Sequence, residues 1–168
     1  MSSAALALRT RGPDDTRALA AAAAPWLRSG DVVALTGELG AGKTCFVQGA
    51  AAALGVQTPV TSPTFTLVRT YPAAVPVVHL DVYRLDRLQD VLELGEDEVM
   101  AADAITFIEW GDAITPLLPR DHLTVELLLG DDDDERRLLM TAAGTWVQRL
   151  AEAAPALDRW RERSGAAC

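Results

Sequence analysis

Residues 37–44 read Gly37-Glu38-Leu39-Gly40-Ala41-Gly42-Lys43-Thr44. They match the pattern G-x-x-x-x-G-K-[ST], in which glycines let successive backbone amides turn inward and form a concave anion site. An apolar run at residues 32–35 precedes the motif, and residues 44–54 have a helix-forming composition. The motif therefore stands between a strand and a helix, and this context predicts a phosphate-binding loop (P-loop) that binds a nucleotide.

Each residue of the motif has an expected task in nucleotide binding. The backbone amides of the loop and the positive end of the helix dipole would hold the phosphates. The Lys43 ammonium would reach the β- and γ-phosphates, and the Thr44 hydroxyl would ligate Mg²⁺. Cys45 follows directly and is counted with the nucleotide-binding residues, as a small packing side chain rather than a redox switch.

The composition describes an acidic globular chain. It has 168 residues, of which 49% are hydrophobic, and a formal net charge of −9. We expect one domain, residues 1–168, with a helical tail from about residue 145. So acidic a surface argues against strong, sequence-independent binding to a nucleic-acid backbone. If the protein serves an RNA pathway, we therefore expect a partner to hold the RNA. Without a signal-peptide pattern or a membrane-length apolar run, a cytoplasmic protein is expected.

Short apolar runs alternate with helical segments along the rest of the chain. Strands are expected at residues 4–9, 32–35, 65–71, 77–81 and 104–109, helices at 13–28, 44–54, 85–102 and 145–163, and a hairpin at 123–129 with 137–141. This alternation predicts an α/β fold of the P-loop NTPase type. Its sheet would be mainly parallel but mixed, flanked by helices, and followed by a C-terminal hairpin and helix.

Two carboxylates end predicted strands, Asp81 and Glu109. Ligands of such sheets lie beyond the carboxyl ends of the strands, so both side chains are expected beside the P-loop. P-loop chemistry needs a carboxylate near Mg²⁺ and a group that places the attacking nucleophile. Glutamate has the longer reach for coordination and aspartate suits the orientation of water, but the residues alone leave the two roles open.

Three further features lie close to these acids. Residues 61–64 (Thr-Ser-Pro-Thr) occupy the position of the first switch of GTPases, where hydroxyls sense the γ-phosphate; a Pro-stiffened turn explains them equally well. His79 is interpreted as a hydrogen-bonded structural histidine of its strand. Trp110 is interpreted as an aromatic residue that packs near the nucleotide.

A P-loop alone is compatible with several activities. The sequence has no Asn-Lys-x-Asp signature for guanine and no Asp-x-x-Gly after the second strand, which argues against a GTPase. A small-molecule kinase is an open alternative, with arginines available for a lid at Arg84, Arg87, Arg136 and Arg137. A binding module controlled by nucleotide is a third.

Four motifs occur in one order along the chain. They are Gly37 to Thr44, Ser62-Pro63-Thr64-Phe65-Thr66-Leu67, His79-Leu80-Asp81-Val82-Tyr83-Arg84-Leu85 and Ile108-Glu109-Trp110. Together they resemble the bacterial TsaE (YjeE) family, the ATPase subunit of tRNA threonylcarbamoyladenosine (t6A) synthesis. The resemblance covers residues 15 to about 137.

The resemblance implies a Mg²⁺-dependent ATPase that is weak alone. It would join the threonylcarbamoyl transferase subunit and its noncatalytic paralogue, and would meet tRNA only through that complex. Thr44 and Glu109 would hold Mg²⁺, and Lys43, Asp81 and Thr64 would serve catalysis, Thr64 within a switch-like loop. Arg136 would lie near the adenine, as would residues 10–16. Cys45 stands where the family more commonly has Thr or Ser.

Overall fold

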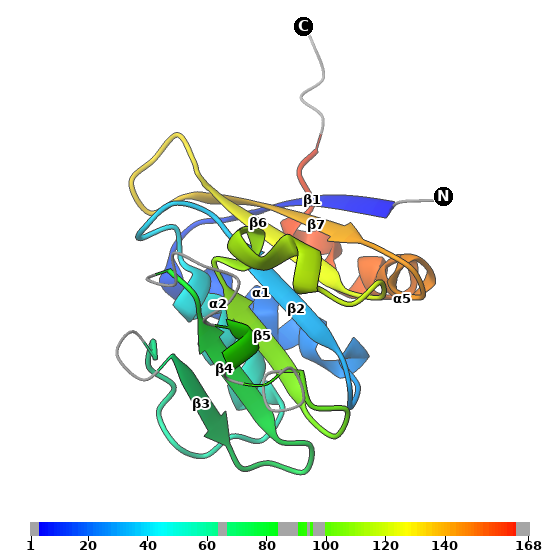
Figure 1. The fold of residues 1–168 in the computed structure, drawn as a ribbon. Coiled ribbons are helices and arrows are strands. Elements are labelled where there is room, and N and C mark those ends of the chain that lie inside the picture. The colour runs from blue at the N-terminus through cyan, green and yellow to red at the C-terminus, as the bar shows by residue number, and fades with distance from the viewer. Residues whose placement is uncertain (1–3, 64–66, 84–90, 94, 96–99, 164–168) are drawn as a thin grey trace, which may run out of the picture.

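The computed structural model describes residues 4–63, 67–83, 91–93, 95 and 100–163. Within them one seven-stranded mixed sheet has the order β1-β7-β6-β2-β5-β4-β3 (Figure 1). The strands are β1 Ala4–Thr10, β2 Val32–Thr36, β3 Val68–Tyr71, β4 Val77–Asp81, β5 Ile105–Glu109, β6 Leu123–Leu129 and β7 Arg136–Ala142. The helices are α1 Pro13–Ala23, α2 Lys43–Ala53 and α5 Trp146–Ala153, with 3₁₀ helices η1 Ala24–Trp26, η2 Gly111–Leu117 and η3 Ala154–Trp160.

The middle of the sheet is parallel and its two sides are antiparallel. β6, β2, β5 and β4 pair in parallel in that order, whereas β7 and β1 on one side and β3 on the other run antiparallel to their neighbours. The register places Asp81 opposite Glu109, and Leu35 opposite Glu109 on the other side. The expected α/β class and mixed sheet are thus confirmed, and the two strand-end acids meet at one edge beside the end of β2.

Side chains along each strand alternate between the two faces of the sheet, and both faces are covered by other elements. α1 and α2 cover one face of the sheet and η2 lies on the other (Figure 1). The buried cluster on the first face includes Val33, Leu35 and Phe107, and on the second Ile114 of η2 packs with Val32, Leu80 and Ile108. α1 and α2 cross closely at Gly49, where a Cβ atom would overlap the backbone of Arg17. A side chain at position 49 would therefore separate the two helices.

The first helix is shorter than expected. α1 ends at Ala23 instead of Arg28, and the chain continues as the tighter η1. Pro25 explains the difference, because its nitrogen has no hydrogen to donate and its ring obstructs a continuing α-helix. The helix expected at residues 85–102 falls largely outside the described residues, as do residues 65–66 of the strand expected before Tyr71. Every described helix is too short or too polar to span a membrane.

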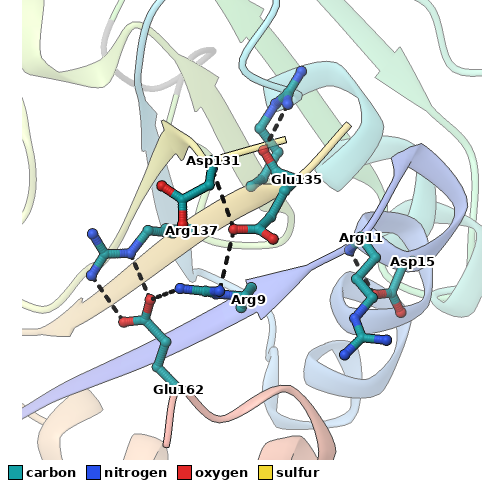
Figure 2. Close-up of polar contacts among 8 residues, drawn as sticks. Arg9, Arg11, Asp15, Asp131, Glu135, Arg137 and Glu162 are labelled. Atoms are coloured by element: carbon teal, nitrogen blue, oxygen red, sulfur yellow. Dashed lines mark hydrogen bonds and ion pairs between the residues drawn. The ribbon is translucent and has the colours of Figure 1, made fainter. Parts of the chain in front are cut away.

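The C-terminal segment packs on β1 and α1. η3 buries Leu157 and Trp160, and Trp160 Nε1 donates to Asp15 at 2.8 Å. Glu162 accepts hydrogen bonds from Arg137 at 2.6 and 3.1 Å and from Arg9 at 3.2 Å (Figure 2). We call Arg9, Arg137 and Glu162 the C-terminal clasp. The Arg137 hydrogen bond lowers the pKa of Glu162, and Glu162 in turn raises the pKa of Arg137.

Candidate nucleotide-binding site

The predicted P-loop connects β2 to α2 and has the shape of a phosphate cradle. α2 begins at Lys43, and Gly42 before it has φ 103°. Gly37 has φ +137°, and a Cβ atom there would overlap the carbonyl of Leu127 on β6. The path of the loop over the sheet edge therefore requires glycine at its start, and its end presents the first amides of a helix.

A cleft of about 600 Å³ opens beside this loop, beyond the carboxyl ends of β2, β4 and β5. Its lining includes Lys43, Thr44, Cys45, Ser62, Asp81, Glu109 and Trp110. The structure thus brings together the residues that the sequence analysis drew from four separate motifs. Thr64 lies outside the described residues. A cleft of this size holds a small ligand with several phosphates.

Lys43 is held beneath an aromatic ring. Its ammonium donates to the carbonyls of Gly37 at 2.7 Å and Glu38 at 2.9 Å, and lies 3.9 Å from the centre of the Trp110 ring. Trp110 reaches this position with a left-handed backbone, φ 62°. Burial lowers the pKa of Lys43, against the opposing effect of Glu109, Asp81 and Asp112. Lys43 is also the only lysine in the sequence.

Glu109 connects three elements. Its Oε1 accepts a hydrogen bond from the Thr44 hydroxyl at 2.6 Å and lies 3.1 Å from Nε2 of His79. Glu109 as a whole is only 3% exposed, and among the described residues none donates to Oε2. Glu109 therefore presents one oxygen that is already hydrogen-bonded and one that is available for a ligand.

Asp81 has different partners from Glu109. Its Oδ2 accepts from the Ser62 hydroxyl at 3.0 Å, and its Oδ1 accepts from the backbone N–H of Tyr83 at 2.9 Å. Ser62 belongs to the segment interpreted as a switch. Asp81 thus contacts that loop, whereas Glu109 contacts the P-loop helix.

The donor set of Thr44 and Glu109 fits Mg²⁺. Both offer hard oxygen atoms, which this cation prefers, and they lie within hydrogen-bond distance of each other. Among the described residues no group of three or more His, Cys, Asp or Glu side chains surrounds one point. Mg²⁺ typically takes only one or two carboxylates from the protein and completes its octahedron with phosphate oxygens and water.

Arg136 of β7 contacts the backbone of the P-loop. Its guanidinium donates to the carbonyls of Ala41 at 3.2 Å, Gly40 at 3.3 Å, Asp133 at 2.6 Å and Glu135 at 2.8 Å. It lines a small cavity of about 60 Å³ together with Thr16 and Cys45. The hydrogen bonds give Arg136 a task in holding the loop, while its proximity to the adenine stays a prediction.

The family pattern described as Threonylcarbamoyl adenosine biosynthesis protein TsaE matches residues 10–138 of the chain. The chain belongs to the TsaE family. Among curated TsaE proteins, that of Treponema pallidum is 41% identical over 118 residues, covering 70% of this chain and 87% of the relative. That of Bacillus subtilis is 38% identical over 146 residues, covering 86% and 90%. Both are named tRNA threonylcarbamoyladenosine biosynthesis proteins.

A solved structure supports the same TsaE assignment. The crystal structure of Bacillus subtilis YdiB superimposes with a TM-score of 0.79 at 34% sequence identity, covering 94% of this chain and 99% of YdiB. The chain therefore shares its fold with YdiB.

The sequence did not indicate three contacts of this TsaE site. They are the Trp110 ring over Lys43, the bond of His79 to Glu109, and the grip of Arg136 on the loop carbonyls. Trp110 and Arg136 were placed near the nucleotide without a partner, and His79 was interpreted as a hydrogen-bonded structural histidine without its partner being identified. A signal for His79 did exist, because it lies two residues before Asp81 and so faces the same side of the sheet.

Proposed function

We propose that this TsaE chain is a Mg²⁺-dependent P-loop ATPase that supports t6A synthesis in tRNA as one subunit of a complex. The observation that carries the proposal is the 2.6 Å hydrogen bond between Thr44 and Glu109 at the mouth of the P-loop. It joins a helix-start hydroxyl to a strand-end carboxylate, the pair through which P-loop enzymes hold the metal of a metal–nucleotide complex.

The residues of the cleft have distinct roles in this proposal. The loop amides and the Lys43 ammonium bind and orient the phosphates, while Thr44 and Glu109 hold Mg²⁺. The metal neutralises charge that develops on the transferred phosphoryl group. Asp81, hydrogen-bonded to Ser62, orients the attacking water. Little covalent chemistry is asked of the chain, because positioning and charge stabilisation supply most of the acceleration.

The proposed partners follow from the pathway named for the relatives and from charge. The curated relatives are named for tRNA threonylcarbamoyladenosine biosynthesis, and this chain has a net charge of −9. So acidic a subunit is suited to meeting tRNA through other proteins. We propose the threonylcarbamoyl transferase subunit and its noncatalytic paralogue, in the cytoplasm, as those proteins, with ATP hydrolysis faster in their presence.

Reconstitution tests the proposal. Purified partners, tRNA, ATP and Mg²⁺ are combined with the wild-type chain, with a Lys43→Ala variant, or without either, and t6A is counted over several turnovers. We expect sustained modification only with the wild-type chain, and free phosphate as the product of ATP. Phosphate found on a small-molecule acceptor would instead identify a kinase, and equal modification without the chain would refute the proposal.

A further inference from the structure

His79 is a polar residue at the centre of β4, among the apolar residues Val77, Val78 and Leu80. It is fully buried on β4 between the buried residues Val78 and Leu80. Within the described part of the chain its one polar contact is the Glu109 carboxylate, 3.1 Å from Nε2, and its Nδ1 has no hydrogen-bond partner. A buried ring with one unpaired nitrogen packs less favourably than an apolar side chain of similar size. Core packing therefore gives no reason for histidine at this position.

The chemistry of the pair fixes the direction of the hydrogen bond. As a cation ligand Glu109 is a carboxylate, which can only accept, so in this role Nε2 carries the hydrogen and donates it to Oε1 of Glu109. The unpaired Nδ1 is then a bare lone pair rather than a buried N–H, which agrees with its having no hydrogen-bond acceptor among the described residues. His79 is thus a donor toward the metal-binding carboxylate of the proposed site.

Strand geometry makes this contact possible. His79 and Asp81 face the same side of β4, and the parallel register pairs them with Phe107 and Glu109 of β5. Asp81 lines the cleft. His79 lies two residues earlier on β4, away from the cleft, and contacts the Glu109 carboxylate from there. Full burial keeps the imidazole away from any nucleotide, so that it can act only through Glu109.

Two donors from different elements define how the carboxylate lies. Thr44 on α2 and His79 on β4 both reach Oε1, which leaves Oε2 as the oxygen that no described residue engages. We propose that His79 is a positioning residue that, through Nε2–H, holds Glu109 in the orientation in which Glu109 and Thr44 receive a divalent cation. The proposal rests on the proposed function, since a metal–nucleotide complex is what this orientation serves. Partners of metal-binding side chains commonly affect metal affinity in this way.

Metal affinity gives the first test. Binding of Mn²⁺ in the presence of ADP is followed by electron paramagnetic resonance for the full-length wild-type chain and for His79→Phe, His79→Gln, Glu109→Gln and His122→Gln. We expect affinity about tenfold weaker in His79→Phe, which keeps ring volume but has no donor. His79→Gln, whose amide keeps a donor, should recover part of the loss. His122 bonds Pro119 O before β6, so His122→Gln should match wild type. ADP affinity without metal should be unchanged in all four variants.

Nitrogen NMR gives a second test that needs neither metal nor activity. The sequence contains two histidines, so the imidazole region of a ¹⁵N spectrum holds two rings. We expect the His79 ring, assigned by its loss in His79→Gln, to be the Nε2–H tautomer. Its signals should move in Glu109→Gln while those of His122 stay in place. This measurement on wild type and Glu109→Gln holds even if His79→Phe fails to fold.

The outcomes separate this proposal from the proposed function. Mn²⁺ that binds wild type and not Glu109→Gln, yet binds His79→Phe as tightly as wild type, refutes the role of His79 alone. An Nδ1–H tautomer for His79 refutes it as well. Wild type that binds no Mn²⁺ with ADP, or Glu109→Gln that binds it normally, overturns the proposed metal site and the positioning role with it.

Discussion

The hydroxyl of Thr44 donates a 2.6 Å hydrogen bond to the carboxylate of Glu109, 65 positions further along the chain. Thr44 stands in the first turn of α2 and Glu109 is the last residue of β5. The parallel pairing of β5 with β2 brings the two together, since it places Glu109 opposite Leu35, just before the P-loop. The metal-dependent step should therefore be sensitive to either partner.

Replacement of Glu109 by glutamine should separate metal-dependent hydrolysis from nucleotide binding. The amide keeps the size of the side chain but removes the charge, so Mg²⁺-dependent phosphate release should fall about 100-fold or more. Binding of a fluorescent ATP analogue in EDTA should stay close to wild type. Glu152→Gln on the exposed side of α5 is the matched control. Hydrolysis by Glu109→Gln at the wild-type rate would contradict the metal assignment.

The single lysine makes Lys43 directly measurable. An acyl phosphate of ATP that reacts with amines should label one lysine-containing peptide, and excess ATP should protect it. Burial lowers the pKa of Lys43, so the reactive amine should appear with a midpoint below 10.5, the ordinary lysine value. A bound triphosphate stabilises the ammonium and should move that midpoint upward. A midpoint at or above 10.5 without nucleotide would be inconsistent with the buried position of this side chain.

Asp81→Asn should retain ATP but hydrolyse it slowly. If Asp81 orients water, loss of its charge should lower kcat by about 100-fold with little change in the Kd for ATP. Ser62→Ala removes one hydrogen bond to Asp81 and should lower kcat only about three- to tenfold. Single-turnover hydrolysis and equilibrium binding measure the two quantities. Unchanged hydrolysis in Asp81→Asn would remove Asp81 from the mechanism.

Arg136 and Arg137 are adjacent residues with separate tasks. Arg136→Ala loses the hydrogen bonds to the loop carbonyls and should weaken ATP binding about tenfold by loosening the cradle. Arg137→Ala loses the bond to Glu162 instead and should leave ATP affinity unchanged while lowering the melting temperature. Calorimetric titration and thermal unfolding of both variants make the comparison. Equal ATP affinity in the two variants would show that the loop does not depend on Arg136.

The C-terminal clasp predicts a pH-dependent contribution to stability. The folded-state pKa of Glu162 is lowered, so its contribution is present above the ordinary glutamate pKa of 4.5 and is lost as the pH falls through the lower folded value. Glu162→Gln should melt about 1–3 °C below wild type at pH 7. The difference should shrink below pH 4.5, whereas Asp132→Asn at the exposed hairpin tip should show no such trend. A difference that persists at low pH would argue against the clasp.

The sequence predicted the parts of this site that are encoded locally. The P-loop depends on eight consecutive residues, and Asp81 and Glu109 were recognisable because each ends an apolar strand. Parallel pairing then placed both acids at one edge, as the structure has them. The bounds of β4 and β5 were predicted to within one residue for the same reason.

Contacts between residues that are far apart in the chain could not be predicted from local sequence patterns. The bond from Arg136 to Ala41 joins residues 95 positions apart. It forms because β6 pairs with β2, which places the β6–β7 hairpin beside the P-loop. The ring of Trp110 covers Lys43 through a left-handed backbone that no local pattern signals. The early end of α1, by contrast, could have been predicted from Pro25, but the alanine-rich composition favoured a longer helix.

The close crossing at Gly49 gives the N-terminal helix an influence on a site it does not form. Any bulk there would pry α1 from α2, and α2 carries Lys43 and Thr44 at its far end. Gly49 lies about two helical turns from Lys43. A change in the tilt of α2 would therefore move the residues that are proposed to bind the phosphates. The proposed hydrolysis should therefore respond to changes outside the cleft, and the methyl group of Gly49→Ala is expected to lower its rate.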